Sequence, residues 1–530
     1  MNAGHPDTLP TTLDEFIEAP FRAIPEVIRA YARDRPRHAA LVQDGRRLDY
    51  AGLDALMDRV AGRLQRDGAK PGDVIAVCAA ASIEYAAVFL GGLRAGVVVA
   101  PLPPTATAES LAAMVADARA KILFLDTEAA KTLEPARGRV AAARVALDNA
   151  NAGEPFDAWL APAGAKPAAP AIQPDWPFNI IYSSGTTGTP KGIVQPHVMR
   201  WGHVQRAVRN GYDRDAVTLI ATPLYSNTTL VSFFPTLALG GTVVLMAKFD
   251  AAGYLAAAEK HRATHTMLVP VQYQRIMALA DFERYDLSSF RMKFCTSAPF
   301  PAALKADILA RWPGGLVEIY GMTEGGVSCA LPAHRHPHKL HTVGQPAPGH
   351  DIRLIDEHGR EVPRGEAGEV VGHSETMMSG YYNQPERTKA AQWHDASGKR
   401  FIRSGDIGRF DEDGFLILVD RKKDMIISGG FNIYPSDIET VVRAHPGVAD
   451  AAVVGVPSTR WGETPVAFVV LKSGAGVTAA ELMQWTNNLV GKIQRLAAVE
   501  LTDGLPRSAI GKVLKRDLRD AYCAKVGALP

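Results

Sequence analysis

Residues 179–192 read NIIYSSGTTGTPKG, an apolar run typical of a strand followed by a loop of glycine, hydroxyl and lysine residues. Three glycines let the backbone approach a ligand closely, five hydroxyls add hydrogen-bond donors, and Lys191 supplies a positive charge. This combination suits a polyphosphate. A solvated turn is the alternative, but the density of these residues directly after an apolar strand favours a phosphate loop.

The loop differs from two common nucleotide-binding patterns. In GxxxxGK[ST] a glycine precedes the lysine and a hydroxyl residue follows it, whereas here Pro190 precedes Lys191 and Gly192 follows it. The hydroxyl that would hold magnesium is therefore missing. The dinucleotide pattern GxGxxG is also absent, and no acidic residue stands at the expected distance after a first strand. These differences argue against a kinase, a GTPase and a dinucleotide enzyme.

Short β-branched runs alternate with alanine-rich amphipathic stretches along the first part of the chain. The pattern predicts strands at 74–77, 97–99 and 122–125, and helices at 51–66 and 110–120. Strands that alternate with helices form crossover units, so we expect largely parallel sheets covered on both faces, and the class is α/β. The stretch 160–177 is rich in alanine and proline and predicts an exposed connector.

Size, charge and cysteine usage narrow the function. The chain of 530 residues is long enough for more than one domain, and its net charge of +2 offers no overall field for nucleic acid or an anionic membrane. A small-molecule substrate is the better expectation. The four cysteines are scattered without CxxC spacing, which argues against a zinc site and a disulfide framework and suits a reducing cytosol.

Neither a signal peptide nor a membrane span is predicted. The first 16 residues lack a basic segment followed by an apolar core, so we expect a cytoplasmic protein. The uncharged stretch 216–247 is long enough to cross a bilayer, but prolines, polar residues and a glycine pair interrupt it. We interpret it as buried core.

The last hundred residues have their own alternation of strands and helices. Residues 419–439 read VDRKKDMIISGGFNIYPSDIE: a charged turn, an apolar run, a glycine pair and a helix start in which Glu439 stands three residues after Ser436, as in a capping box. Beyond it, strands are predicted at 451–456 and 466–471 and a helix at 479–490. We therefore expect an N-terminal domain over 1–422 and a C-terminal domain over 423–530.

The stretch YSSGTTGTPKG resembles the signature of the adenylate-forming superfamily, which includes acyl-CoA synthetases, aryl-CoA ligases, peptide adenylation domains and luciferases. Further motifs stand in the family's order: YGMTE at 320–324, RSGD at 403–406, DRKKD at 420–424 with GG at 429–430, and PRSAIGK at 506–512. The resemblance runs from about residue 20 to the end. It implies a large domain of stacked mixed sheets with helices and a small, mobile α+β C-terminal domain.

The resemblance implies an acid:CoA ligase that uses ATP, magnesium and coenzyme A. The carboxylate of the acid attacks the α-phosphate of ATP and expels diphosphate, and a thiol then displaces AMP from the acyl-adenylate. Two anions must meet, so the protein has to position them and neutralise charge. The implied ATP-binding residues are Ser183, Ser184, Gly185, Thr186, Thr187, Gly188, Lys191, Tyr320, Asp406 and Arg421.

Individual roles follow from the same resemblance. Tyr320 would stack on adenine, Asp406 would accept hydrogen bonds from the ribose, and Thr323 would contact the α-phosphate. Glu324 would hold magnesium, since a carboxylate is a hard oxygen ligand. Lys512 is similar to the family's catalytic lysine, which reaches the α-phosphate from the small domain on a long, flexible stem.

The second substrate is inferred from the domain junction. Lys423 stands at the family's hinge, and the resemblance implies that the small domain rotates after adenylation, so that Gly429 and Gly430 line a pantetheine tunnel. Coenzyme A is therefore the expected acceptor. Two alternatives remain: an enzyme that loads a carrier protein, and a catalytically silent binding protein, which would be expected to lose Lys512, Glu324 or Lys191.

The sequence does not decide whether the acid substrate is fatty or aromatic. The residues expected to shape the acyl pocket are Tyr225, Ser226, Thr228, Thr229, Ser297, Ala298 and Gly325. Ser226 stands where many members of the family have a histidine. No basic residue is evident there, which argues against a dicarboxylate. The partners are then small molecules only, with a monomeric or homodimeric enzyme.

Four histidines in the loop 333–341 suggest metal at first sight. They alternate in a proline-containing loop, without the i, i+4 helical pairing or the carboxylate of a convincing site. We expect a solvated loop.

Overall fold

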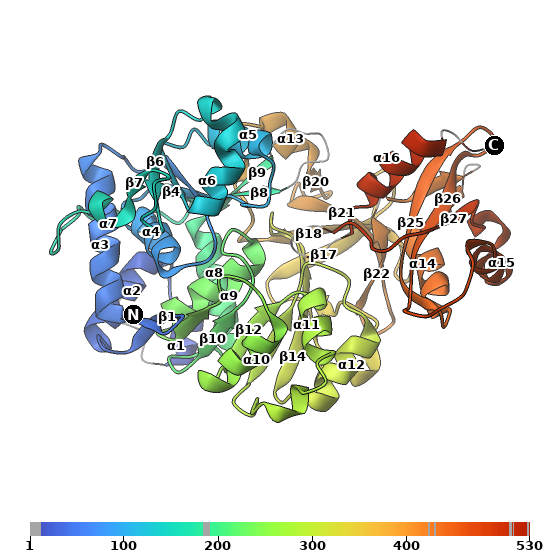
Figure 1. Ribbon diagram of the computed structural model, residues 1–530, viewed down its shortest axis with the longest axis horizontal. Helices are drawn as coiled ribbons and strands as arrows, with labels where there is room; N and C mark the ends of the chain where they lie inside the picture. Colours follow the sequence, from blue (N-terminus) through green and yellow to red (C-terminus); the bar gives the residue numbers. More distant parts are fainter. Residues whose placement is uncertain are drawn as a thin grey trace. The chain divides into compact units, whose positions relative to one another are not determined.

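The computed structural model describes residues 12–183, 191–421, 424–428, 431–507, 511, 513–526 and 529. The chain divides into two compact units, one of residues 1–340 and 373–402 and the other of residues 341–372 and 403–530. The architecture is mixed α/β, as predicted (Figure 1). The domain boundary expected near residue 422 stays a prediction.

Two sheets form the framework of the first unit. The first sheet has the strand order β19-β9-β8-β4-β3-β5-β6-β7, and the second contains the run β15-β14-β13-β12-β10-β11-β1-β2. The strands of the first sheet are β3 (Val74–Cys78), β4 (Val98–Pro101), β5 (Ile122–Leu125), β6 (Ala143–Ala146), β7 (Glu154–Pro155), β8 (Pro177–Ser183), β9 (Lys191–Pro196) and β19 (Gly380–Tyr381). Those of the second are β1 (Ala39–Gln43), β2 (Arg46–Asp49), β10 (Val217–Ile220), β11 (Thr242–Leu245), β12 (His265–Leu268), β13 (Met292–Cys295), β14 (Gly315–Gly321) and β15 (Ser328–Pro332).

Parallel pairing dominates the interior of both sheets, and antiparallel pairing is found at their margins. Strands β3 to β7 and the junction of β4 with β8 are parallel, whereas β8, β9 and β19 run antiparallel to one another. In the second sheet β14 is followed by an antiparallel partner, β15. The two motifs of greatest interest therefore follow β8 and β14, each of which pairs antiparallel with the next strand along the chain.

Helices of the first unit cover the sheets. They are α1 (Leu13–Glu18), α2 (Ile24–Asp34), α3 (Tyr50–Arg66), α4 (Ile83–Arg94), α5 (Ala108–Asp117), α6 (Thr127–Leu133), α7 (Phe156–Trp159), α8 (His197–Arg209), α9 (Asn227–Ala238), α10 (Ala251–Lys260), α11 (Pro270–Met277), α12 (Ala302–Arg311) and α13 (Pro385–Ala390). The predictions of β3, β5 and α3 agree with these bounds within one residue. No helix or strand forms between 161 and 176, where a connector was predicted.

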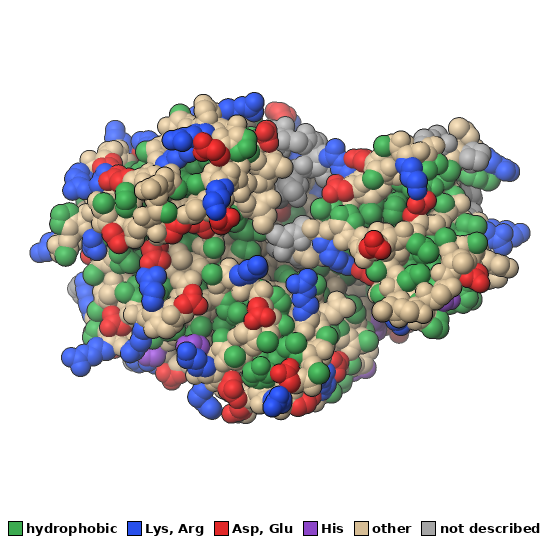
Figure 2. All heavy atoms as spheres, viewed as in Figure 1, with side chains coloured by type: hydrophobic (Ala, Val, Ile, Leu, Met, Phe, Trp, Pro, Cys, Tyr) green, Lys and Arg blue, Asp and Glu red, His purple; other side chains and the backbone are tan. Residues whose placement is uncertain are grey.

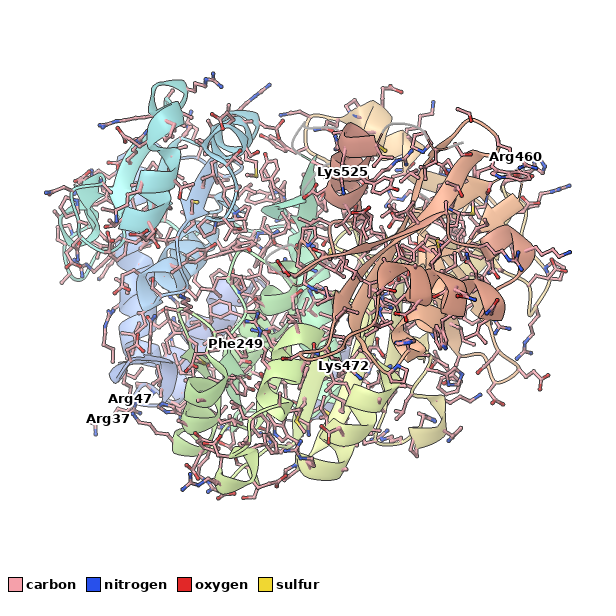
Figure 3. All side chains as sticks on the ribbon, turned by 45° about the vertical axis from the view of Figure 1, so that its right-hand side comes forward. Arg37, Arg47, Phe249, Arg460, Lys472 and Lys525 are labelled. Carbon is pink, nitrogen blue, oxygen red and sulfur yellow. The ribbon has the colours of Figure 1, made fainter. Side chains whose placement is uncertain are left out.

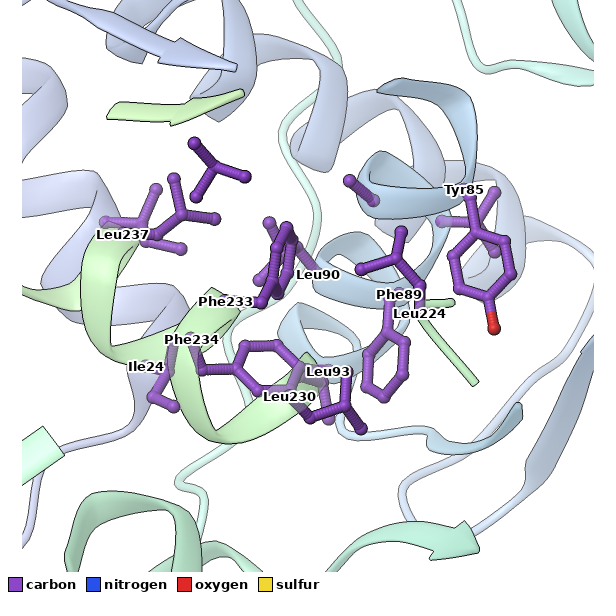
Figure 4. Packing of buried hydrophobic residues seen from close by; sticks show 14 of the residues in the cluster. Ile24, Tyr85, Phe89, Leu90, Leu93, Leu224, Leu230, Phe233, Phe234 and Leu237 are labelled. Carbon is purple, nitrogen blue, oxygen red and sulfur yellow. The ribbon is translucent and has the colours of Figure 1, made fainter. Parts of the chain in front are cut away.

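The stretch 216–247 forms β10, α9 and β11 in the core. Leu230, Phe233 and Leu237 of α9 pack with Phe89 and Leu90 of α4 (Figure 4). Burial of these apolar faces removes them from water, which is the main favourable contribution to folding. None of the helices in the described residues is long and apolar enough to cross a bilayer.

The second unit contains a sheet with the order β17-β18-β21, in which β22 also pairs with β21, and a separate sheet further along the chain. The first has β17 (His350–Ile355), β18 (Gly368–Ser374), β21 (Arg400–Phe410) and β22 (Leu416–Arg421). The second has the order β24-β23-β26-β25 with β27 beside β26, formed by β23 (Ile426–Ser428), β24 (Phe431–Ile433), β25 (Val448–Ser458), β26 (Gly462–Leu471) and β27 (Ala498–Leu501). The short strands β16 (Gln345–Pro346) and β20 (Gln392–His394) complete the description.

Side chains of β25 and β26 alternate between two apolar clusters, so both faces of this sheet are covered. Val453 and Val469 pack with Ile438 of α14 (Pro435–Ala444), whereas Val454 and Phe468 pack on the opposite face, against α16 (Lys515–Val526). The helix α15 (Ala479–Leu489) also contributes to the first cluster. A small α+β layer of this kind agrees with the predicted C-terminal fold.

One predicted detail of α14 is wrong. The residue before this helix is Tyr434, and Ser436 lies inside the helix without capping it. The backbone N–H of Ser436 donates instead to Asp420 Oδ2 (2.9 Å), and Glu439 Oε1 accepts from the backbone of Val453 (2.8 Å). Tertiary partners thus replace the local capping box.

Charged side chains of both signs are mixed on the face of the molecule shown in Figure 2. Several basic side chains project from the periphery, and Arg37 and Arg47 lie together in Figure 3, where Arg47 Nη2 donates to the backbone oxygen of Arg37 (2.8 Å). All four cysteines are unpaired thiols. Among the described residues no group of three histidine, cysteine or acidic side chains is arranged to hold a metal ion. His334, in the loop with four histidines, bonds with the backbone of β14.

Candidate active site

The antiparallel pairing of β8 and β9 brings the two ends of the phosphate loop together. Ser183 stands opposite Lys191, and Tyr182 stands opposite Gly192. The hydroxyl of Tyr182 donates to Asp117 Oδ2 (2.6 Å), which fixes the strand before the loop. The predicted phosphate-binding residues Ser184, Gly185, Thr186, Thr187 and Gly188 lie outside the described residues.

Lys191 and Glu324, predicted from separate motifs, meet in the structure. Lys191 Nζ lies 2.7 Å from Glu324 Oε1, and the Glu324 side chain is only 8% exposed. The hydroxyl of Tyr381 donates to the same oxygen (2.9 Å), and Lys191 Nζ lies 4.3 Å from the centre of the Tyr381 ring. The low exposure of this ion pair reduces screening by water.

Tyr381 is a site residue that the sequence did not reveal. It reaches Glu324 because β19 pairs with β9, where Tyr381 stands opposite Ile193. Burial, and next the neighbouring Glu324 carboxylate, raise the pKa of Tyr381 well above its usual range, so this phenol stays a hydrogen-bond donor. Tyr381 also lines an open cavity of about 480 Å³ with residues of α13. The pairing of β19 with β9 is what reveals that Tyr381 lies at the site.

The turn after β14 holds Thr323 and Glu324 in a fixed position. The backbone oxygen of Glu324 accepts from the N–H of Met378 (2.8 Å), and the oxygen of Thr323 accepts from Gln195 Nε2 (2.7 Å). Gly325 has φ +72°, and a Cβ there would stand 3.1 Å from both Met199 Cε and the oxygen of Thr376. Glycine is therefore required for the close approach of this turn to its neighbours. Tyr320 lies at the end of β14 and is half-buried.

The residues expected at the acyl pocket lie at the start of α9 and after β13. Ser226 precedes the first residue of α9, and Tyr225 is half-buried, with its pKa raised by burial. Thr228 and Ser297 share a hydrogen bond of 2.5 Å between their hydroxyls, and Ser297 has φ +82°.

Two of the expected pocket residues have structural roles that the sequence did not indicate. Thr229 is fully buried; its hydroxyl donates to the oxygen of Pro223 (2.6 Å) and lies 2.7 Å from Thr222 Oγ1. These contacts with Thr222 and Pro223 stabilise the start of α9. Gly325 lies against Met199 and Thr376, as described above. Ala298 follows Ser297 in the chain and is half-buried.

The predicted ribose site lies in the second unit. Asp406 of β21 stands opposite Arg421 of β22, and the backbone N–H of Asp406 donates to Ser404 Oγ (3.0 Å). Arg403 Nη1 nearby donates to Glu369 Oε2 (2.8 Å). The strand pairing thus brings together two residues that stand fifteen positions apart in the sequence.

Four further predicted residues lie outside the described residues: Lys423, Gly429, Gly430 and Lys512. The glycine pair falls between β23 and β24, which are adjacent antiparallel strands with Ser428 opposite Phe431.

Comparison with known proteins identifies the class. The family model described as AMP-binding enzyme matches residues 28–382, and the model described as AMP-binding enzyme C-terminal domain matches residues 437–512. The chain belongs to the AMP-binding enzyme family, which confirms the resemblance seen in the motifs. It is an ATP-dependent acyl-CoA ligase of the AMP-forming class.

Individual relatives extend over almost the whole chain. Feruloyl-CoA synthase of Amycolatopsis sp. is 36% identical over 502 residues, which are 93% of this chain and 97% of that protein. Indoleacetate–CoA ligase of Aromatoleum aromaticum is 33% identical over 513 residues, 94% of this chain and 98% of that protein. Among solved structures, ATP-bound MatB from Rhodopseudomonas palustris superposes with a TM-score of 0.84 at 30% identity and covers 94% of this chain and 99% of its own.

Proposed function

We propose that this enzyme activates an aromatic carboxylic acid as its acyl-adenylate and transfers the acyl group to coenzyme A. The observation that carries the adenylation step is the buried Glu324 carboxylate, held on one oxygen by Lys191 and Tyr381 and placed beside Thr323. Two of the similar ligases described above are named for aromatic acids, feruloyl and indoleacetate. A fatty acid is the other class consistent with the family.

Each phosphate of ATP has a proposed partner. The residues from Ser183 to Lys191 hold the β- and γ-phosphates, and Lys191 leaves Glu324 to pair with them when the nucleotide binds. Thr323 donates to the α-phosphate, where negative charge grows as the carboxylate attacks. Tyr320 stacks on adenine, and Asp406 accepts from the ribose with help from Arg421. The support is the family membership together with two strand pairings. The pairing of β8 with β9 places Ser183 opposite Lys191, and the pairing of β21 with β22 places Asp406 opposite Arg421.

Glu324 fits the proposed magnesium site. Its Oε1 accepts hydrogen bonds from Lys191 Nζ and from the Tyr381 hydroxyl, and its Oε2 bonds with none of the residues that the structure describes. Carboxylate oxygens are the protein ligands that Mg²⁺ binds alongside phosphate oxygens. When bound, magnesium would supply charge neutralisation at the polyphosphate.

The acyl pocket suits a flat ring better than a second charge. Thr228 and Ser297 share one hydrogen bond between their hydroxyls, so only one of their two hydroxyl hydrogens remains to be donated to another group. Ser226 has a smaller side chain than the histidine that many members of the family have at this position. Small side chains such as Ala298 then accommodate an aromatic ring.

The thioester half-reaction rests on the family resemblance alone. Lys512 would act in adenylation, and rotation about Lys423 would then bring Gly429 and Gly430 to the pantetheine arm. We propose the corresponding domains at 1–422 and 423–530. The unpaired thiols favour a reducing cytoplasm. We propose a monomer or homodimer there.

A substrate screen tests this function. Diphosphate and AMP release would be measured with cinnamic, hydroxycinnamic, benzoic, arylacetic, and short and medium fatty acids, each with and without coenzyme A. We expect the highest kcat/KM with an aromatic acid and a thioester only when coenzyme A is present. Preference for a fatty acid would refute the aromatic assignment. AMP release without coenzyme A and without a thioester would instead indicate a carrier-loading enzyme.

A further inference from the structure

Arg200 is a fully buried cation close to the site, with no role in the reaction described so far. It lies on α8, and its guanidinium carbon stands 5.7 Å from the Phe178 ring and 5.8 Å from the Phe234 ring. Within the described ranges no carboxylate bonds with it, and burial lowers the pKa of Arg200 to about 9. A charge without a counter-ion in the core is costly, so its neighbours must compensate.

Two buried amides surround this guanidinium. Asn179 Oδ1 accepts from Arg200 Nε (3.1 Å) and Nη2 (2.9 Å), and Gln195 Oε1 accepts from Nη2 and from Asn179 Nδ2 (3.0 Å). Because a guanidinium has only donors, both amides must turn their oxygens toward it. The NH₂ group of Gln195 is thereby forced to face the other way.

That NH₂ group meets the turn of the active site. Gln195 Nε2 donates to the backbone oxygen of Thr323 (2.7 Å) and to Asn227 Oδ1 (3.2 Å), which uses both of its hydrogens. Gln195 is fully buried, so water does not compete for these bonds. Asn227 is the first residue of α9, in the segment that leads to the acyl pocket.

Strand β9 contacts the turn through side chains on one of its faces. Residues 191, 193 and 195 point to the same side of a strand. Lys191 reaches Glu324, Ile193 packs in the cluster that Met322 contacts, and Gln195 bonds with Thr323. Three alternate residues of one strand therefore hold three successive residues of the turn.

We propose that Gln195, oriented by Arg200, is a positioning residue for adenylation. It fixes the Thr323 backbone so that the Thr323 hydroxyl is aimed before the α-phosphate develops its charge, and the aligned amides direct the positive field of Arg200 toward the same turn. This inference rests on the proposed contact of Thr323 with the α-phosphate.

The substitution Gln195→Glu separates positioning from simple support of Arg200. The new side chain keeps an acceptor for Arg200 and adds a counter-charge, but it loses both donors to Thr323 and Asn227. We expect an unchanged or higher melting temperature and a kcat for adenylation, measured by diphosphate release, lower by ~10- to 100-fold. The KM for ATP should change little, and thioester formation from supplied acyl-adenylate should be retained.

Gln205→Glu is the matched control. Gln205 Nε2 also donates to two backbone oxygens, those of Ile17 (2.8 Å) and Ala19 (3.1 Å), but not at the site. We expect a lower melting temperature with normal adenylation. A stable Q195E enzyme with normal adenylation, or an equal loss in both half-reactions, would overturn the inference.

Two further variants complete the test. If Q195E does not fold, the uncharged and similarly sized Gln195→Met takes its place. Its rates of adenylation and of thioester formation are then compared in the same way. Thr323→Val separates this inference from the proposed function: normal adenylation in T323V would refute the role of Thr323 itself. Impaired T323V with unaffected Q195E would refute only the positioning by Gln195.

Discussion

At the scale of single residues, the candidate site depends on contacts between side chains of β9 and the turn that follows β14. Lys191, Thr323 and Glu324 stand in recognisable motifs, and the structure brings Lys191 and Glu324 together within 2.7 Å. Gln195 and Tyr381 belong to no recognisable motif. Tyr381 reaches the site because β19 pairs with β9, and Gln195 lies on β9 itself. Without the pairing of distant segments, a buried glutamine or tyrosine cannot be distinguished from ordinary core.

Glu324→Gln is expected to lower the kcat for adenylation by ~100-fold. The amide still offers an oxygen to Lys191 and Tyr381, so the fold should persist, but the negative charge proposed for magnesium is lost. Diphosphate release against magnesium concentration measures this, and the concentration for half-maximal rate should rise. The exposed Glu283, paired with Arg311 (2.9 Å), provides Glu283→Gln as a control with normal kinetics. An unaltered magnesium dependence in E324Q would exclude Glu324 as the ligand.

His197 predicts an acid-sensitive stability. It is buried against Phe178, and burial lowers its pKa to about 3 from the ordinary 6.5. Between these values the unfolded chain binds a proton that the folded chain does not, so stability is lost as pH falls from 6.5 toward 3, by about 1.4 kcal/mol per pH unit. His197→Phe keeps an aromatic ring and should lose less stability over this range.

Chemical unfolding at several pH values between 4 and 7.5 compares the two proteins. His394→Gln, at an exposed position, should follow the wild-type curve. Parallel pH curves for wild type and H197F would contradict a neutral buried imidazole.

At the scale of elements, short apolar runs and amphipathic spacing were sufficient to predict β3, β5 and α3, because local pattern and burial agree there. The capping box at Ser436 was wrong because Asp420 and the backbone of Val419 offer that residue tertiary partners. The order of strands could not be deduced either, since β8 lies beside β4 although about eighty residues separate them. Pairing of that kind depends on the whole core.

The contact of α3 with α4 predicts a destabilising substitution. A Cβ added at Gly91 would stand 2.5 Å from Val60 Cβ and 3.0 Å from the oxygen of Met57. Gly91→Ala should therefore force the helices apart and cost about 1–3 kcal/mol, seen as a lower melting temperature. Gly138→Ala, where nothing lies within 4 Å, should have little effect. Equal stability of both variants would show that the helices yield without cost.

At the scale of the whole molecule, the proposed chemistry divides between parts of the chain. Lys512→Ala should nearly abolish adenylation, because the family resemblance assigns the neutralisation of charge at the α-phosphate to this lysine. Thioester formation from supplied acyl-adenylate should persist, since rotation would remove Lys512 from that step. The two half-reactions are measured separately by diphosphate release and by thioester yield. Equal loss in both would contradict the rotation.

The chain passes from one compact unit to the other three times, after residues 340, 372 and 402. Strand β21 has β18 on one side and β22 on the other, so a chain ending at 402 would leave β18 without that neighbour. A chain ending near 422 would keep the whole ladder from β17 to β22. Recombination between related enzymes is therefore best made after β22, where one crossover transfers the C-terminal layer and preserves every strand pairing around Asp406.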